Sequence, residues 1–355
     1  MSELSQTQSP DRVLGRSIGR MAWERFRKNP RGMVGLCFIL LMLALAFFSP
    51  LLANRQPIIC KYQGAWYFPG VVDVIHNIPF ASLVILKSPP FSRATFNAAQ
   101  DLSPEEFAIW PLVPYGPKET SGRTLAPPCR EHWLGTDQNG RDVLARMIYG
   151  CIVSIQVGII SMGIATLIGV ILGAVAGFWG GWIDILISRF IEIVQCFPTF
   201  FLILAILAWL EPSIVNVMVV IGLTSWTSIA RYTRGEFIRL LGQEYVLATR
   251  ALGCHPERIM FKHILPNAIA PVLVTVTFGI AAAILSEAGL SWLGFGVQQP
   301  DPSWGNILRD AYDHLRSAPH LVYPPCIAIF LAVLSYNLVG DALRDAIDPR
   351  ISRET

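Results

Sequence analysis

Charge is scarce in this sequence. Asp, Glu, Lys and Arg make up only 15% of its 355 residues, whereas soluble proteins carry roughly 25%. Apolar residues reach 53%, and they gather in uncharged runs of about 20 residues, the length that crosses a bilayer as a helix. The formal net charge of +3 is too small to indicate nucleic-acid binding. The composition excludes an ordinary soluble domain and predicts an integral membrane protein.

Motifs that hold nucleotides or metals are missing as well. The sequence has no G-x-x-x-x-G-K-[ST] loop to bind phosphates and no H-E-x-x-H spacing to bind zinc. Its seven cysteines show no C-x-x-C spacing. We therefore expect no cofactor and no metal in this chain. Cys60 and Cys129 both lie in the long polar segment, and they remain a candidate disulfide if that segment faces an oxidising compartment.

Six uncharged runs are long enough to be transmembrane helices. The first, 32–54, follows a basic segment, 1–31, and it is too long and begins too late for a cleaved signal peptide. Hydrocarbon offers no partner for free backbone groups, so each run is expected to be helical, with kinks at prolines such as Pro198 and Pro271. The sequence predicts an all-α membrane protein with six transmembrane helices. The other five runs are 151–182, 193–210, 212–230, 264–286 and 321–340.

Basic residues near the ends of short loops predict the orientation of the chain. They gather in the N-terminal segment, in a polar insert at 232–265 and in the tail at 344–355, whereas the opposite short loops offer only Arg309 and Arg316. By the positive-inside rule both termini and the insert are cytoplasmic. The segment 55–150 is then a long external, periplasmic loop, and 151–343 is a membrane core of five helices.

A stripe of small residues marks the second predicted span. In "GVILGAVAG", Gly169, Gly173 and Gly177 are spaced four apart and share one helix face. Such stripes let two membrane helices pack backbone to backbone. The stripe predicts a helix-packing face; glycines that are merely tolerated in an apolar helix are the alternative.

The polar insert contains "EYVLATRALGCHPERIMFKHILPN", residues 244–267. We expect one helix from Glu236 to Leu252, a left-handed corner at Gly253 and a second helix from Pro256. Ala248 and Ala251 share a face with little side chain. Such a corner can dock into a groove of another protein. An interfacial helix on anionic lipid is the alternative, and it would prefer a basic face opposite large apolar residues.

The insert resembles the cytoplasmic coupling loop, the "EAA" loop, of bacterial ABC importer permeases. Thr249 and Cys254 depart mildly from that pattern. "HWLGTDQNGRDVLARMIYG" at 132–150 and "EAGLSWLGFGVQQPDPSWGNIL" at 287–308 resemble signatures of the C-type permeases of dipeptide/oligopeptide transporters. "ANRQPIICKYQGAWYFP" is similar to the Yej-type subgroup, which is associated with peptides and microcin C. The residues that match the coupling loop are Glu244, Ala248, Ala251, Gly253, Ile264, Leu265 and Pro266.

The resemblance implies a type I ABC importer permease in the bacterial inner membrane. Its implied partners are a homologous B-type permease, ABC ATPase subunits that bind ATP and Mg, a periplasmic substrate-binding protein and membrane lipid. Peptides are the implied substrate, and no nucleic acid is expected. The chain itself is then no enzyme, because the ATPase hydrolyses the ATP. Import of nickel or glutathione is the alternative within the family.

Two alternatives lie outside the family. An ion-driven transporter needs ionisable residues deep in its spans. Arg189 and Glu192, three apart, are expected to form a local ion pair instead, and Glu287 and Asp341 are expected at span ends within reach of water. A membrane enzyme or assembly factor with the external loop as its working part is the second. The aromatic residues of that loop fit local packing, anchoring at the membrane surface or contact with a binding protein.

Overall fold

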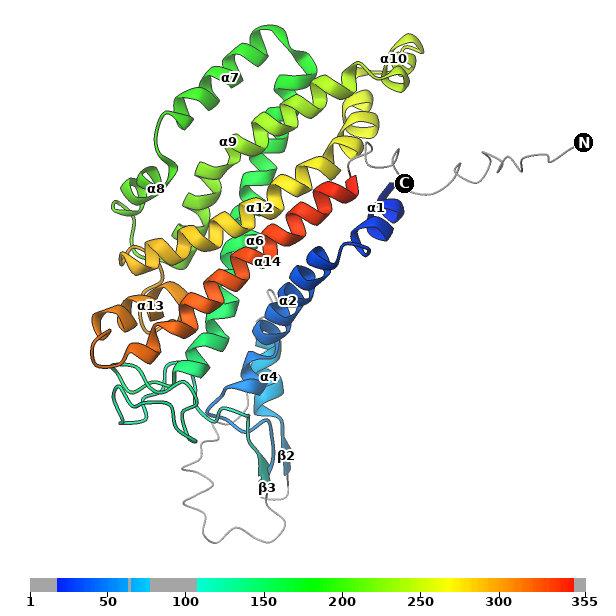
Figure 1. The fold of residues 1–355 in the computed structure, drawn as a ribbon. Helices are drawn as coiled ribbons and strands as arrows, with labels where there is room; N and C mark the ends of the chain where they lie inside the picture. The colour runs from blue at the N-terminus through cyan, green and yellow to red at the C-terminus, as the bar shows by residue number, and fades with distance from the viewer. Residues whose placement is uncertain (1–17, 63–64, 77–106, 348–355) are drawn as a thin grey trace, which may run out of the picture.

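The computed structural model describes residues 18–62, 65–76 and 107–347, and it shows a bundle of long helices with a small sheet at one end (Figure 1). The shorter elements lie mainly at the two ends of the bundle. The helices before the sheet are α1 (Ile18–Phe26), α2 (Pro30–Phe47) and α3 (Ser49–Leu52). The later elements are α6 (Val143–Trp179), α7 (Gly181–Gln195), α8 (Thr199–Leu207), α9 (Ile214–Leu241), α10 (Glu244–Ala251), α11 (Pro256–Arg258), the π-helix η3 (Ile259–Ile264), α12 (Leu265–Trp292), α13 (Trp304–Asp313), the 3₁₀-helix η4 (Pro319–Leu321) and α14 (Tyr323–Ile347).

Five helices of the described chain are long and apolar enough to cross a membrane, or six if the bent pair α7–α8 counts as one span. The two members of that pair are bent by 77° at their junction. Pro198 lies at this junction and caps α8, and a proline lacks the backbone donor that would continue a helix. The chain is thus a mostly helical, multi-pass membrane protein.

Several predicted span bounds are wrong. The first helix ends at Phe47 instead of 54, and Pro50 lies in the separate turn α3. The second begins at Val143, eight residues before 151, because Asp142 caps it there. The predicted third span, 193–210, includes only the last three residues of α7, because the charged residues of α7 interrupt its apolar run. The fourth does not stop at 230 but continues to Leu241.

The α6–α9 pair is the most extensive helix contact of the bundle; α12 packs against both of these helices, and α14 packs against α12 and α2 (Figure 1). The glycine stripe of α6 faces α9. A Cβ at Gly169 would come within 2.7 Å of Ile229 Cβ, one at Gly173 within 2.8 Å of Thr233 Cβ and one at Gly177 within 2.7 Å of Phe237 Cβ. Since real Cβ atoms do not approach this closely, only glycine allows α6 and α9 to pack at this distance.

A three-stranded antiparallel sheet corrects the all-α prediction. Its strands pair in the order β2-β1-β3, with Cys60 opposite Tyr67 on one side and Ala108 on the other. Aromatic and β-branched residues in these short segments favour strands. The expected external loop thus contains folded structure between α2 and α6. Its elements are β1 (Ile59–Tyr62), β2 (Ala65–Tyr67), α4 (Pro69–His76) and β3 (Phe107–Ile109).

The two ends of the bundle carry different elements. The sheet, α4 and α13 lie at one end, and α10 lies at the other, together with α1 and the end of α14 (Figure 1). The first and last described residues, Ile18 and Ile347, are therefore at the same end as the polar insert. The rest of the predicted N-terminal segment, at 1–17, and of the tail, at 348–355, lies outside the described residues.

Candidate functional site

The polar insert forms a protruding corner at the end of the bundle (Figure 1). The predicted helix from 236 to 252 is wrong, because α9 ends at Leu241 and α10 begins at Glu244. Gly242, at this break, is a weak helix former, since glycine loses the most backbone freedom when it is ordered. After α10 the chain turns at Gly253 and enters α11 with Pro256 in its first turn. We call α10, the Gly253 corner and α11 the knob (residues 244–258).

The corner of the knob is a glycine turn with two specific backbone hydrogen bonds. Gly253 has φ +72°, which confirms the predicted left-handed conformation. Its N–H donates to Arg250 O at 3.0 Å, and Cys254 N–H donates to Thr249 O at 3.1 Å. These two bonds form a Schellman motif, which satisfies carbonyls at the end of α10. The predicted restart at Pro256 is also confirmed, because proline is pre-organised for a first helical turn.

The root of the knob is held by apolar burial. The side chain of Val246 is fully buried, and burial of a valine contributes about 1.5–3 kcal/mol. Arg250 also lies over the Phe178 ring of α6, with its guanidinium carbon 5.9 Å from the ring centroid. The knob is thereby joined to the ends of α6, α9 and α12. Val246 packs in one cluster with Phe237, Leu240, Ile259, Met260, Ile264 and Ala268.

The predicted coupling residues fall into two groups, one on the knob and one at the start of α12. Glu244, Ala248, Ala251 and Gly253 are all exposed on the knob. Ile264, Leu265 and Pro266 lie further on, where the chain enters α12, and Ile264 is fully buried. The first group is thus on an open surface, whereas exposure rises through the second, from the buried Ile264 to the half-buried Leu265 and the exposed Pro266.

Leu252 is the exposed apolar tip that sequence reasoning missed. Its exposed fraction is 82%, and Leu247 and Phe261 are exposed nearby. An apolar side chain directly before a predicted glycine corner was the available signal. A highly exposed apolar side chain at the tip of a protrusion is typical of a protein-interaction surface.

The opposite end of the bundle is braced by buried ions. Asp137 Oδ2 accepts a hydrogen bond from Arg141 Nε at 2.7 Å and lies 3.4 Å from Arg146 Nη1. Arg146 is only 1% exposed. Its Nη2 lies 3.8 Å from Asp310 Oδ2 of α13, and Arg141 Nη2 lies 3.6 Å from the same oxygen. Burial raises the pKa of Asp310, partly offset by the two arginines.

A second buried pair fixes the start of α6. His132 Nδ1 and Asp142 Oδ2 are 2.7 Å apart, and Asp142 Oδ1 accepts from the N–H of Ala145 at 2.8 Å. A carboxylate at this position complements the helix dipole and satisfies a free N–H group. The stretch 132–146 therefore ties the segment before α6 to α6 itself and to α13.

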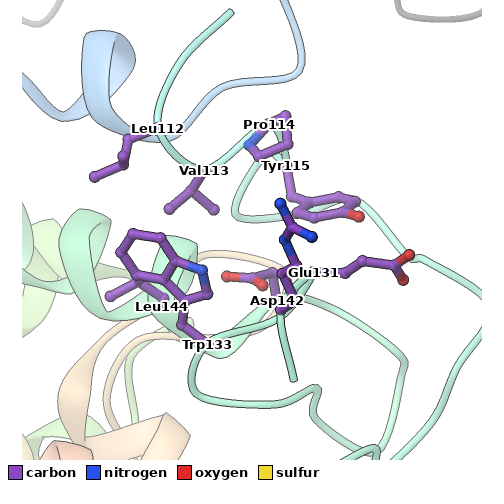
Figure 2. Close-up of a pocket in the computed structure, with 9 residues that line it drawn as sticks. Leu112, Val113, Pro114, Tyr115, Glu131, Trp133, Asp142 and Leu144 are labelled. Carbon is purple, nitrogen blue, oxygen red and sulfur yellow. The ribbon is translucent and has the colours of Figure 1, made fainter. Parts of the chain in front are cut away.

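A hollow of about 400 Å³ lies beside this second pair. Figure 2 shows the rings of Tyr115 and Trp133 on either side of the Asp142 carboxylate. Both oxygens of that carboxylate already accept the hydrogen bonds described above. The Asp142 carboxylate at the floor of the hollow is thus already occupied by structural hydrogen bonds. Its other lining residues are Leu112, Val113, Pro114, Arg130, Glu131 and Leu144.

The predicted disulfide is contradicted by the structure. Cys60 and Cys129 are both free thiols. Cys60 is buried in the sheet against Tyr67, Ala108 and Trp110, and burial raises the pKa of its thiol, whereas Cys129 is exposed. Among the described residues, no three His, Cys, Asp or Glu side chains gather as metal ligands.

Comparison with known families decides the identity of this architecture. Residues 169–353 match the binding-protein-dependent transport system inner membrane components, and residues 17–64 match the N-terminal transmembrane domain of oligopeptide transport permease C. The chain belongs to this permease family.

Similar proteins agree with this assignment. The permease is 43% identical over 227 residues to the dipeptide transport system permease protein DppC of Alkalihalophilus pseudofirmus, across 64% of this chain and 75% of the relative. It is 32% identical over 339 residues to the inner membrane ABC transporter permease protein YejE of Escherichia coli, across 94% and 97%. It is 38% identical over 224 residues to the glutathione transport system permease protein GsiD of Pectobacterium atrosepticum, across 63% and 74%.

Ionisable residues within the spans of the permease differ in part from the expectation. The Arg189–Glu192 ion pair is confirmed, at 2.6 Å and exposed. The expectation that water reaches Glu287 is wrong, because its exposed fraction is 0% and Ser291 Oγ donates to its Oε1 at 2.5 Å. The chain therefore holds a buried carboxyl in α12. The ion pair between Asp184 of α7 and Arg234 of α9 was missed, because α7 was not recognised as part of a span.

Proposed function

We propose that this chain is the C-type permease subunit of an ABC importer for peptides. In this proposal the knob receives ATP-driven motion from a separate ATPase subunit. The observation that carries the proposal is the division of the knob: its tip is exposed and partly apolar at Leu252, while its root at Val246 is fully buried against the bundle. An element with an exposed tip and a buried root can bind a partner through the tip and transmit the partner's motion to the helices through the root.

The proposed motion passes through the α6–α9 pair. Val246 packs against Phe237 and Leu240 of α9, and Arg250 contacts Phe178 of α6. The glycine stripe lets α6 and α9 pack backbone to backbone, and this close packing is expected to keep the two helices together. A push on the knob is then expected to rotate the pair as a rigid body. Alternating access follows if the path opens to one side of the membrane in each orientation.

The orientation and the partners also belong to this proposal. Both termini and the knob are cytoplasmic, in the inner membrane, and the sheet faces the periplasm. The basic residues near the knob support this, since Arg234, Arg239 and Arg250 lie at its end of the bundle. A B-type permease encloses the path with this chain, a periplasmic binding protein delivers the substrate, and the ATPase holds ATP and Mg.

Peptides are the proposed substrate because the relatives DppC and OppC are named for dipeptide and oligopeptide transport. YejE matches nearly the full length of both chains, which supports the Yej-type subgroup. Glutathione is the second candidate, because a glutathione permease is 38% identical. Glutathione is itself a small peptide, so both candidates require a path that accepts a peptide backbone.

The experiment is uptake of labelled oligopeptides and of labelled glutathione by the assembled transporter with Gly253→Val in this chain. A β-branched residue at φ +72° strains the corner. Uptake and binding-protein-stimulated ATP hydrolysis are expected to fall by about ten-fold or more, with membrane insertion unchanged. Gly235→Val is the control, because φ is not positive at Gly235 and an added Cβ there meets no atom within 4 Å. Undiminished uptake in Gly253→Val would refute the coupling role of the knob.

A further inference from the structure

The corner between α6 and α7 is open and made of glycine. Gly180 and Gly181 have φ +64° and +55°, and an added Cβ at either would meet no atom within 4 Å. Glycine adopts these angles without strain, and without neighbours the corner has no packing to fix the direction in which α7 leaves α6. The start of the bent span α7–α8 therefore needs another contact to hold it to the bundle.

An ion pair supplies this contact one turn into α7. Arg234 of α9 donates to Asp184 through two nitrogens, Nε to Oδ1 and Nη2 to Oδ2, the latter at 2.7 Å. Ser188 Oγ donates to Asp184 Oδ1 at 3.3 Å. The two-pronged geometry fixes the orientation of both side chains as well as their distance.

Arg234 lies on the rigid part of the bundle. Its Cα would be 3.2 Å from a Cβ at Gly177, which is the last glycine of the stripe on α6. One helical turn further along α9, Phe237 packs in the cluster that buries Val246 at the root of the knob. Arg234 thus joins α7 to the same unit of α6, α9 and knob that is proposed to move.

We propose that the Asp184–Arg234 ion pair is the positioning contact that makes the bent span α7–α8 follow the α6–α9 pair during transport. The pair acts four residues after the glycine corner, in the first turn of α7. Further along α7, Ile187 and Ile191 pack in the main hydrophobic cluster, and the Phe190 and Trp226 rings stack with their centroids 5.7 Å apart. Those apolar contacts hold the middle of α7, and the ion pair adds a directional contact at its start. The inference rests on the proposed function of the knob.

The test uses the full transporter in liposomes, with Asp184→Asn, Arg234→Gln, and the charge-reversed double variant Asp184→Arg/Arg234→Asp. The readout is peptide uptake per ATP hydrolysed. Each single variant is expected to lower this ratio about five- to ten-fold with stimulated ATP hydrolysis retained, and the double variant to recover at least about half of it. Glu192→Gln is the control, because that residue pairs with Arg189 on the exposed face of α7. Unchanged ratios in both single variants, or a double variant no better than the singles, would overturn the proposal.

A second readout does not depend on the substrate. Spin labels at the exposed positions Leu186 of α7 and Ile238 of α9 report the distance between the two helices in the assembled complex. A narrow distance distribution is expected in the parent chain with and without ATP, and a broadened one in Asp184→Asn. An equally narrow distribution in Asp184→Asn would overturn the positioning role. If instead no peptide is transported by any form, the label distances still decide this inference, and only the proposed substrate fails.

Discussion

The two ends of the bundle are stabilised by different chemistry. At the end with the sheet, Asp137 is buried with Arg141 and Arg146, which both form ion pairs with it, and Asp310 completes the group from α13. At the end with the knob, a single buried valine anchors an element whose other side chains are mostly exposed. Buried ions fix a structure in place, because each charge is costly without its partner. The knob instead is anchored by an apolar contact, so its exposed tip remains available to another subunit.

This difference separates stability from function along the molecule. Substitutions in the buried ion group should lower the free energy of unfolding before they change transport. Substitutions at the tip of the knob should do the reverse. The glycine stripe lies between the two ends and is expected to affect both, because it joins the helices that carry the knob to those that carry the ion group.

Asp137→Ala is expected to have the largest effect on stability. It removes the carboxylate that accepts from Arg141 and faces Arg146, and it leaves two buried arginines without this partner. Loss of one partner from a buried pair costs about 3–5 kcal/mol. Thermal unfolding of the purified chain in detergent measures the loss. The matched control is Glu131→Ala, whose pair with Arg123 is exposed and is worth about 0–1 kcal/mol. Equal losses of stability in the two variants would contradict a stabilising role for the buried ion group.

Gly173→Leu should have the next largest effect. The new side chain would meet Thr233 Cβ and the backbone of Ala230, so α6 and α9 must separate. Overpacking of this kind costs about 1–3 kcal/mol and should also lower transport in the variant that still inserts. Gly163→Leu on the same helix is the control, because an added Cβ there meets no atom within 4 Å. If both variants unfold at the same temperature, the stripe is not a packing face.

Leu252→Ala is expected to change stability the least of these variants, and it tests whether the tip of the knob serves function alone. The side chain is 82% exposed, so truncation should alter the free energy of unfolding by no more than about 0.5 kcal/mol. Binding-protein-stimulated ATP hydrolysis should nevertheless fall several-fold, because the tip is expected to fill a pocket of the ATPase. Trp209→Ala is the control on a side chain that is 92% exposed at the other end of the bundle. If Leu252→Ala keeps full stimulation of ATP hydrolysis, Leu252 is not part of the coupling surface.

Local patterns in the sequence predicted the features that depend on a few neighbouring residues. The spacing of Gly169, Gly173 and Gly177 indicated a shared face, and all three meet α9. Gly253 and Pro256 indicated the corner and the restart, since glycine accepts a left-handed conformation and proline suits a first helical turn. The Arg189–Glu192 pair also formed as expected, because residues three apart on a helix are neighbours.

Features that depend on distant residues were not predictable in this way. Arg146 and Asp310 meet although they are far apart in sequence, and no local pattern links them. The polar side chains of α7 hid a span that is bent at Pro198 and whose Asp184 pairs with α9. Cys60 and Cys129 are free thiols, and the burial of Cys60 depends on strand pairing that no local pattern of the sequence shows. The burial of Val246 likewise depends on distant residues, because it packs against Ile264 and Ala268 as well as against α9.

The central claim is that the tip of the knob contacts an ATPase subunit on the inner face of the membrane. The most direct measurement is photo-crosslinking in intact cells with a photoreactive amino acid at position 252, compared with the same residue at the exposed position 209. We predict that position 252 forms a covalent product with the ATPase subunit and that position 209 does not. A product with a periplasmic protein at position 252, or equal products with the ATPase at both positions, would contradict the account.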